Sequence, residues 1–246
     1  LVARILYCLG TGDGLQVTRC FVAPRRDRHP SGRKRSDSYH LGGGCSGRAT
    51  SDDMTQLTDR QLRAALLMRL KAQPVSPRAI LEEVRVHNGN AIADVVSVHT
   101  RPHCYEIKGE TDEIRRIVKQ GEFYDRAFQR ITLVTTENHL FAAARLAPAH
   151  WGVMVASAGS RRRTPALRYI RKSTDSPFFD KQVALLTLWK SELLSLCVDE
   201  EVHLSKLNRL GLTRHIAQAS AAYDISSWIG EKLVNRQATN GWSVAM

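Results

Sequence analysis

The sequence predicts an α/β protein in which helices cover a mixed β-sheet and a helical region follows at the C-terminal end. Three observations lead to this prediction. Short apolar or alternating runs typical of strands recur between residues 84 and 157, amphipathic helical patterns separate them, and only helical patterns follow Pro177. The hydrophobic fraction of 43% over 246 residues is ordinary for a globular protein with a sizeable core.

Residues 1–53 differ in composition from the rest of the chain. They are rich in Arg, Ser and Gly and show no helical or strand period. Such a composition cannot offset the entropy cost of ordering the chain. We expect a disordered basic leader that precedes a natural start at Met54, and the alternative is a basic arm that binds phosphate.

Residues 54–157 are expected to form the core. Thr58 can cap a first helix, and residues 79–84 follow as a short helical or turn element. Thr111 can cap a second long helix, with Asp112 in its first turn. Strands are expected at 84–87, 91–98, 104–109, 130–136 and 152–157, and a short helix at 139–147. The resulting order is αβββαβ, then αβ.

A basic segment is expected to connect this core, over residues 158–174, to a helical module over residues 175–246. The connector carries no acid, and its basic residues are candidates for sequence-independent phosphate contact: Arg161, Arg162, Arg163, Arg168, Arg171 and Lys172. Within residues 204–236 two interpretations stay open. One is a helix-turn-helix with Gly211 at the turn. The other is a helical cap packed through Leu204, Leu207, Leu210, Ile216, Trp228 and Ile229.

The formal net charge of +12 points to a polyanionic partner such as nucleic acid. No apolar run approaches the ~18 residues that span a bilayer, so we expect no membrane partner. The five cysteines are odd in number and lack CxxC spacing, which favours reduced thiols in the cytoplasm.

The hairpin over residues 92–110 carries charges inside its strands, at Asp94, Glu106 and Lys108. Side chains alternate along a strand, so Glu106 and Lys108 share one face. Asp94 joins them only if the numbers of paired residues sum to an even value, as with a three-residue turn at 101–103. A two-residue turn would place Asp94 on the other face.

If these side chains converge, two carboxylates would meet in a partly dehydrated site and would need a cation. Oxygen ligands with spare coordination positions suit Mg²⁺. Glu83 is our candidate for a third carboxylate, with Glu82 in reserve, and Gln120 and Tyr124 share one face of the following helix. The alternative is an edge hairpin with a solvated charged face.

The pattern E-x10-D-x11-E-x-K on an αβββαβ core resembles the PD-(D/E)XK superfamily of restriction-endonuclease-like nucleases, and Q-x-x-x-Y resembles an element of its RecB-type branch. Residues 54–240 are also similar to a bacterial family of that superfamily with a C-terminal helical module. This chain departs from that family at Ile92, at "KGETDE" and at "AHWG".

The resemblance implies a Mg²⁺- or Mn²⁺-dependent phosphodiesterase that acts on DNA. Asp94 and Glu106 would bind the metal, Glu83 would complete the acidic set, and Lys108 would assist the attacking water. Gln120 and Tyr124 would support these groups.

Two other hypotheses are kept beside the nuclease. One is a non-catalytic DNA-binding regulatory protein that uses the helical module. The other is a nuclease subunit that is silent without a protein partner.

Overall fold

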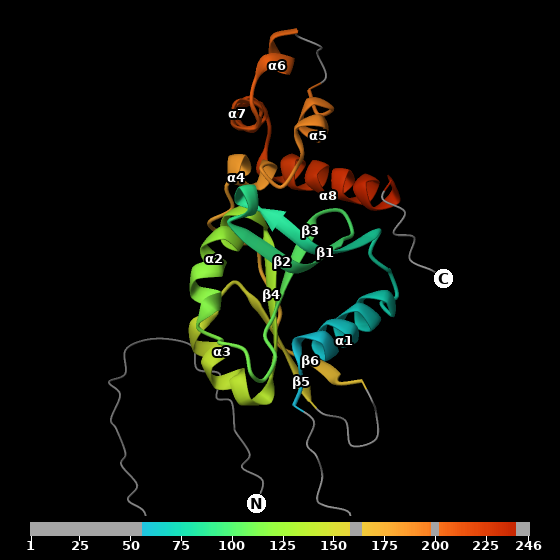
Figure 1. Cartoon of the computed structure of the whole chain (residues 1–246), viewed down its shortest axis with the longest axis vertical. Helices are drawn as coiled ribbons and strands as arrows, with labels where there is room; N and C mark the ends of the chain where they lie inside the picture. Colours follow the sequence, from blue (N-terminus) through green and yellow to red (C-terminus); the bar gives the residue numbers. More distant parts are fainter. Residues whose placement is uncertain (1–55, 158–163, 198–201, 240–246) are drawn as a thin grey trace, which may run out of the picture. The chain divides into compact units, whose positions relative to one another are not determined.

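A six-stranded mixed sheet forms the centre of the protein, in the order β1-β2-β3-β4-β5-β6 (Figure 1). The computed structural model describes residues 56–157, 164–197 and 202–239. The strands are β1 (Ala79–Val86), β2 (Ala91–Val98), β3 (Pro102–Ile107), β4 (Arg130–Thr136), β5 (Gly152–Ser157) and β6 (Ala166–Arg171). The β3–β4 and β4–β5 pairs are parallel, and the other pairs are antiparallel. The expected α/β class and mixed sheet are confirmed.

Helices lie on both faces of this sheet. They are α1 (Asp59–Lys71), α2 (Arg116–Ala127), α3 (Leu140–Leu146), α4 (Lys181–Leu185), α5 (Lys190–Leu194), α6 (Val202–Lys206), α7 (Arg209–Ala219) and α8 (Ala222–Thr239). Leu62, Leu66 and Leu70 of α1 are fully or almost fully buried against one face, with Tyr105 and Ile107 of β3. On the other face α2 packs through Ile117 and Tyr124 against β1, β2 and β4.

Thr58 caps α1 as expected, because its hydroxyl accepts a hydrogen bond from the Gln61 amide and the Gln61 side chain accepts one from the Thr58 amide. The prediction that Thr111 caps the second long helix is wrong. Helix α2 begins at Arg116, since the Asp112 carboxylate accepts from the Gly109 amide at 2.7 Å and holds the preceding residues in a turn.

Two segments differ from the expected secondary structure. Residues 79–84, expected to be helical or a turn, belong to β1 and pair along β2 from Ala79↔Val98 to Val86↔Ala91. The expected basic connector contains β6, which pairs with β5. The sheet therefore continues into residues that their composition alone assigns to a linker.

The helical region shares one hydrophobic core with the sheet. Leu185, Ile216, Ile229 and Leu233 are buried in the same cluster as the strand residues that α2 covers. Gly230 of α8 lies so close to the β2–β3 turn that a Cβ atom there would be 2.4 Å from the Thr100 carbonyl oxygen.

Of the side chains expected to pack a helical cap, Leu204, Ile216 and Ile229 are buried and Leu207 is partly buried. Leu210 and Trp228 are exposed. Gly211 lies inside α7, and the break between helices comes before it. Among the described helices, none has the length and apolar character to cross a membrane.

Candidate active site

The β2–β3 hairpin opens like a fork at the position of Asp94. Pairing between the two strands runs from Val98↔Pro102 to Val95↔Tyr105 and leaves residues 99–101 as the turn. The turn has the expected length but lies two positions earlier than expected. Paired numbers sum to an even value, which meets the condition for Asp94 to lie with Glu106 and Lys108.

Side chains take over the hydrogen bonds where the two strands part. The Ile107 amide donates to Asp94 Oδ2 at 2.7 Å, so a carboxylate replaces the missing backbone partner. The Tyr124 hydroxyl has one proton, which it shares between the Ile92 carbonyl oxygen of β2 at 2.6 Å and the Glu106 carboxylate at 2.8 Å. Because buried backbone groups must be paired, these contacts fix the ends of β2 and β3 where the two strands separate.

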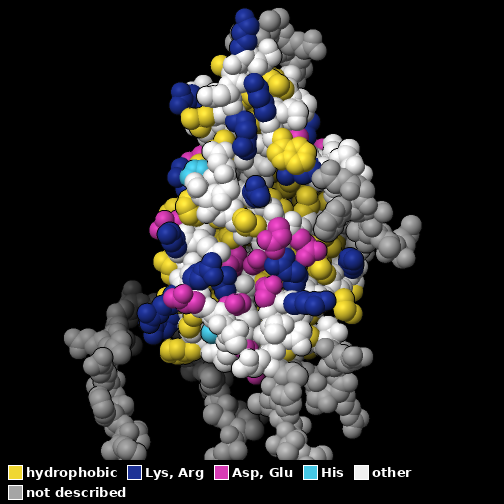
Figure 2. Space-filling model, viewed as in Figure 1, with side chains coloured by type: hydrophobic (Ala, Val, Ile, Leu, Met, Phe, Trp, Pro, Cys, Tyr) yellow, Lys and Arg dark blue, Asp and Glu magenta, His cyan; other side chains and the backbone are white. Residues whose placement is uncertain are grey.

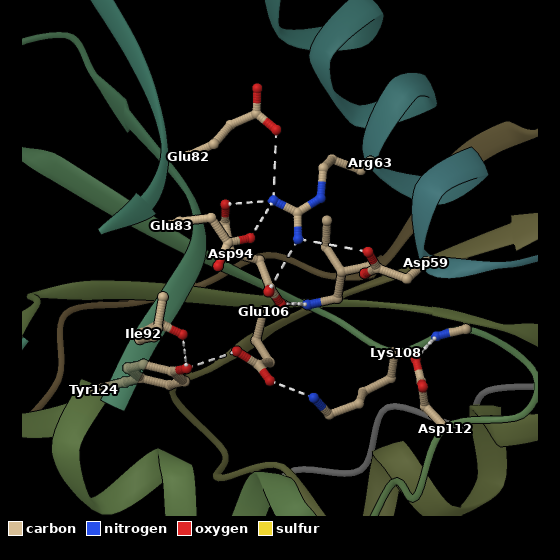
Figure 3. Close-up of polar contacts among 12 residues, drawn as sticks. Asp59, Arg63, Glu82, Glu83, Ile92, Asp94, Glu106, Lys108, Asp112 and Tyr124 are labelled. Atoms are coloured by element: carbon tan, nitrogen blue, oxygen red, sulfur yellow. Dashed lines mark hydrogen bonds and ion pairs between the residues drawn. The ribbon is translucent and has the colours of Figure 1, made fainter. Parts of the chain in front are cut away.

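Glu106 lies at the base of the fork and is 1% exposed. Its Oε1 accepts a hydrogen bond from Lys108 Nζ, and its Oε2 accepts one from the Tyr124 hydroxyl at 2.8 Å (Figure 3). Lys108 is also largely buried, so the ion pair has little contact with water. The lysine and the tyrosine thus hold the carboxylate from two sides.

Arg63 of α1 gathers the other carboxylates of the site. Its guanidinium lies 2.8 Å from Glu83, 3.2 Å from Asp94 and 3.4 Å from Glu82, as Figure 3 shows. Burial opposes its charge, but the carboxylates of Asp59, Asp94 and Glu83 outweigh that effect and raise the pKa of Arg63.

Glu83 has a positive φ of 54° within a strand. Adjacent strand residues normally point to opposite faces. The left-handed conformation breaks this alternation, so both Glu82 and Glu83 reach Arg63. Such a conformation costs a residue with a side chain about 1–2 kcal/mol and is most common at functional sites.

The electrostatics of the site centre on Asp94. Burial and the neighbouring Glu106 carboxylate raise the pKa of Asp94 to about 7, although the Ile107 amide, Lys108 and Arg63 act in the opposite direction. Burial and Glu106 also raise the pKa of Tyr124. The phenol therefore stays a hydrogen-bond donor. The Asp94 carboxyl keeps its proton up to a higher pH than an ordinary Asp, because its neighbours do not fully compensate a negative charge there.

A cleft of about 460 Å³ joins these groups. Asp94, Glu106, Lys108 and Gln120 all contribute to its wall, and Glu83 lies at its rim with 60% of its side chain exposed. The Gln120 side-chain oxygen is buried and has no hydrogen-bond partner among the described residues. Of the six expected site residues, Glu106 contacts Lys108 and Tyr124, Asp94 and Glu83 share Arg63, and Gln120 lines the same cleft as Asp94 and Glu106.

The donor set of this cleft fits Mg²⁺ or Mn²⁺. Each of the two carboxylates uses two of its roughly four acceptor positions on protein donors, which leaves the others for a cation. Across the described ranges, no three His, Cys, Asp or Glu side chains are placed to enclose a metal. Mg²⁺ is commonly held by one or two carboxylates with water and substrate phosphate completing its shell.

The expected phosphate-binding residues are not equivalent. Arg168 and Lys172 are exposed on and after β6. Arg171 instead donates to the Trp151 and Pro148 carbonyl oxygens, at 2.7 and 2.8 Å. It therefore holds the segment that precedes β5 in place. Arg161, Arg162 and Arg163 lie outside the described residues, as do residues 1–53.

Sequence reasoning missed Arg63. Its spacing of four residues from Asp59 resembles a common surface ion pair on a helix. One signal was available in the sequence. More acidic side chains were expected near one end of the sheet than Lys108 alone can neutralise, which indicates a second basic residue there.

Comparison with known proteins adds a family. The family model described as bacteriophage P4 protein cII matches residues 52–239. The chain belongs to this family. Every site residue described above lies within the match to the protein cII family.

Two further comparisons give no information about function beyond the protein cII family. No curated protein matches the chain. A solved structure of the SPO1766 protein of unknown function from Silicibacter pomeroyi is similar, with 15% identity and a TM-score of 0.37. That match covers 77% of this chain and 97% of the other.

Proposed function

We propose that this protein is a metal-dependent nuclease that hydrolyses DNA phosphodiester bonds. The observation that carries the proposal is the convergence of Asp94, Glu106 and Lys108 on one cleft. Charged groups are expensive to bury, and an arrangement of this kind has a ready explanation when a cation and a phosphate complete it.

The order of elements supports assignment to the PD-(D/E)XK superfamily. Helix α1, strands β1 to β3, helix α2 and strand β4 follow one another as αβββαβ in a mixed sheet. The candidate residues lie on β2, on β3 and directly after it, and on α2, which are the positions that the resemblance implies.

Asp94 and Glu106 would hold Mg²⁺ or Mn²⁺ through their remaining acceptor positions, and Glu83 lies close enough to add an outer contact. When bound, such an ion polarises a phosphoryl oxygen, lowers the pKa of water and neutralises developing negative charge. The high pKa of Asp94 supports this assignment, because a nearby divalent cation would favour its ionised form.

The remaining side chains position the reactants. Lys108 projects its ammonium group beside Glu106, where it can orient the attacking water and stabilise charge on the phosphate. Tyr124 fixes the orientation of Glu106 by hydrogen bonding to its other oxygen. Gln120 contributes a carboxamide to the cleft, and its unpaired oxygen can accept a hydrogen bond from the water.

DNA is the proposed substrate because the chain carries a formal charge of +12. Arg168 and Lys172 are proposed to contact phosphates outside the cleft, and Arg161, Arg162 and Arg163 keep that role as a prediction. A cytoplasmic location and a requirement for a protein partner also stay predictions.

The test is a cleavage assay on linear, nicked and branched DNA with Mg²⁺ or Mn²⁺. We expect cleavage by the wild type, no cleavage with chelator, and a loss of at least about 100-fold in Lys108→Ala, Asp94→Ala and Glu106→Gln. Lys71→Ala is a matched control, since Lys71 is an exposed lysine at the end of α1. It should cleave like the wild type.

Two results would contradict the proposal. One is the absence of cleavage on every DNA form. The other is cleavage that persists in the three site variants. Sequence-specific DNA binding that survives both chelator and Glu106→Gln, without hydrolysis, would instead support the DNA-binding regulatory protein.

A further inference from the structure

A second depression lies beside the candidate active site. It has a volume of about 590 Å³, within the ~300–1,000 Å³ typical of pockets that hold small molecules or their parts. Its walls come from β1, from the segment between α4 and α5, and from α7 and α8. Glu83 and Gly89 contribute to both depressions. The second depression, called the groove from here on, therefore continues the cleft along β1.

The groove offers an exposed aromatic ring in a fixed position. Trp189 is 51% exposed, and the guanidinium carbon of Arg236 lies 4.3 Å from the centre of its ring. Arg236 is held in turn by Glu192, whose Oε1 accepts from its Nε at 2.9 Å. An indole fixed in this way is a surface on which a flat ring can stack without a large ordering cost.

Two buried polar groups of the groove wall lack partners. Thr187 is 4% exposed, and its hydroxyl has no hydrogen-bond partner among the described residues. The same holds for Nε of Arg209. Buried polar groups are normally hydrogen-bonded, so a ligand in the groove or an ordered water molecule would supply the missing partners of these two groups.

Charge changes along the groove. Glu83 stands at the end that the groove shares with the cleft, Glu82 precedes it on β1, and Arg85, Arg209 and Arg236 line other parts. Arg209 donates to the carbonyl oxygens of Leu186 and Leu188, which carry no compensating negative charge. Figure 2 shows charged side chains gathered over β1 and hydrophobic ones between this cluster and α5.

A peptide strand fits the groove poorly. β1 is the edge of the sheet, where an extended peptide would be expected to add. Gln237 already donates to the Ile80 carbonyl oxygen at 3.2 Å and accepts from the Ile80 amide at 3.0 Å. The aromatic ring, the basic side chains and the unpaired donors suit a nucleotide better.

We propose that this groove binds unpaired nucleotides of a DNA strand next to the bond that is cut in the cleft. One base stacks on Trp189, and the hydroxyl of Thr187 and the guanidinium of Arg209 meet its polar edge or phosphate. The indole face can stack only on a base that is not already stacked in a duplex. This inference rests on the proposed function, because it assigns the substrate as DNA with a single-stranded segment.

The test measures binding of a fluorescently labelled ten-nucleotide oligo(dT) in EDTA, where cleavage cannot contribute. Trp189→Ala should weaken binding roughly 10-fold, the effect expected for the loss of one stacked base. Trp189→Phe should remain within about 3-fold of the wild type. Thr187→Val keeps the shape of a buried side chain and should weaken binding several-fold.

Trp228→Ala is the matched control, because Trp228 is an exposed tryptophan of α8 outside the groove wall. It should bind like the wild type, and a duplex of the same length should bind more weakly than the single strand. Equal affinity of the wild type, Trp189→Ala and Thr187→Val would overturn the inference. So would the absence of single-strand binding by the wild type.

The outcomes also separate this inference from the proposed function. Groove-dependent binding without any cleavage in Mg²⁺ would leave the groove assignment standing and refute the nuclease. Cleavage with the same KM and kcat in the wild type, Trp189→Ala and Thr187→Val would leave the nuclease standing and refute the groove assignment.

Discussion

Replacing Asp94 by Asn should change how the stability of the protein depends on pH. The pKa of Asp94 is about 7 in the folded protein and 3.8 when unperturbed. Between these values the folded protein holds a proton that the unfolded chain has released. The free energy of unfolding therefore falls as pH rises, by about 1.4 kcal/mol per unit, and the fall is complete above pH 7.

From pH 5 to pH 8 this effect amounts to about 3 kcal/mol for the wild type. Asp94→Asn retains an oxygen that can accept from the Ile107 amide but cannot ionise. We therefore expect the stability of the wild type, relative to the variant, to decrease by about 3 kcal/mol over this range. Taking the difference between the two proteins removes the contribution of titrating groups that do not interact with Asp94.

The assay is urea unfolding followed by tryptophan fluorescence at pH 5, 6, 7 and 8. Saturating Mg²⁺ at pH 8 should raise the stability of the wild type and leave that of Asp94→Asn nearly unchanged, because ligands that bind only the folded state stabilise it. A difference between the two proteins that stays constant from pH 5 to pH 8 would refute the reasoning about Asp94.

Substitutions at Glu83, Gly230 and Tyr124 test the geometry further by urea or thermal unfolding. Glu83→Gly should be about 1 kcal/mol more stable than Glu83→Ala, because glycine adopts the positive φ of this position at lower cost. Gly230→Ala should lower the free energy of unfolding by about 1–3 kcal/mol, since its Cβ would collide with the Thr100 carbonyl oxygen, whereas Gly211→Ala in α7 should not destabilise to that extent. Tyr124→Phe should cost about 1–3 kcal/mol, because it removes the proton that the Ile92 carbonyl oxygen and the Glu106 carboxylate share. Unchanged stability in Gly230→Ala or Tyr124→Phe, or equal stability of the two Glu83 variants, would contradict these contacts.

Strands β2 and β3 could be predicted from the sequence because their apolar residues, such as Val96, Val98 and Cys104, follow the pattern of a buried hairpin. The parity rule gave the condition for Asp94 to lie with Glu106, and the three-residue turn at 99–101 meets it. Both inferences depend on local periodicity, which side-chain alternation makes reliable.

The parts that the sequence did not predict depend on tertiary contacts. The run Leu81–Glu82–Glu83 has the composition of a helix, but pairing with β2 makes it part of a strand, which the positive φ of Glu83 interrupts. Arg63 lies in a helix whose sequence gives no sign of the carboxylates that meet it from β1 and β2. Contacts between residues far apart in the chain override local preference in both cases.

The carboxamide of Gln237 makes the two backbone hydrogen bonds at Ile80 of β1 that a neighbouring strand would otherwise make. Open sheet edges are templates for pairing with other chains, and proteins commonly cover or interrupt them. If the end of α8 is lost through proteolysis or early termination, the amide and carbonyl groups of Ile80 become available. Shortened forms of the protein should then self-associate edge to edge, because both groups can pair with another chain.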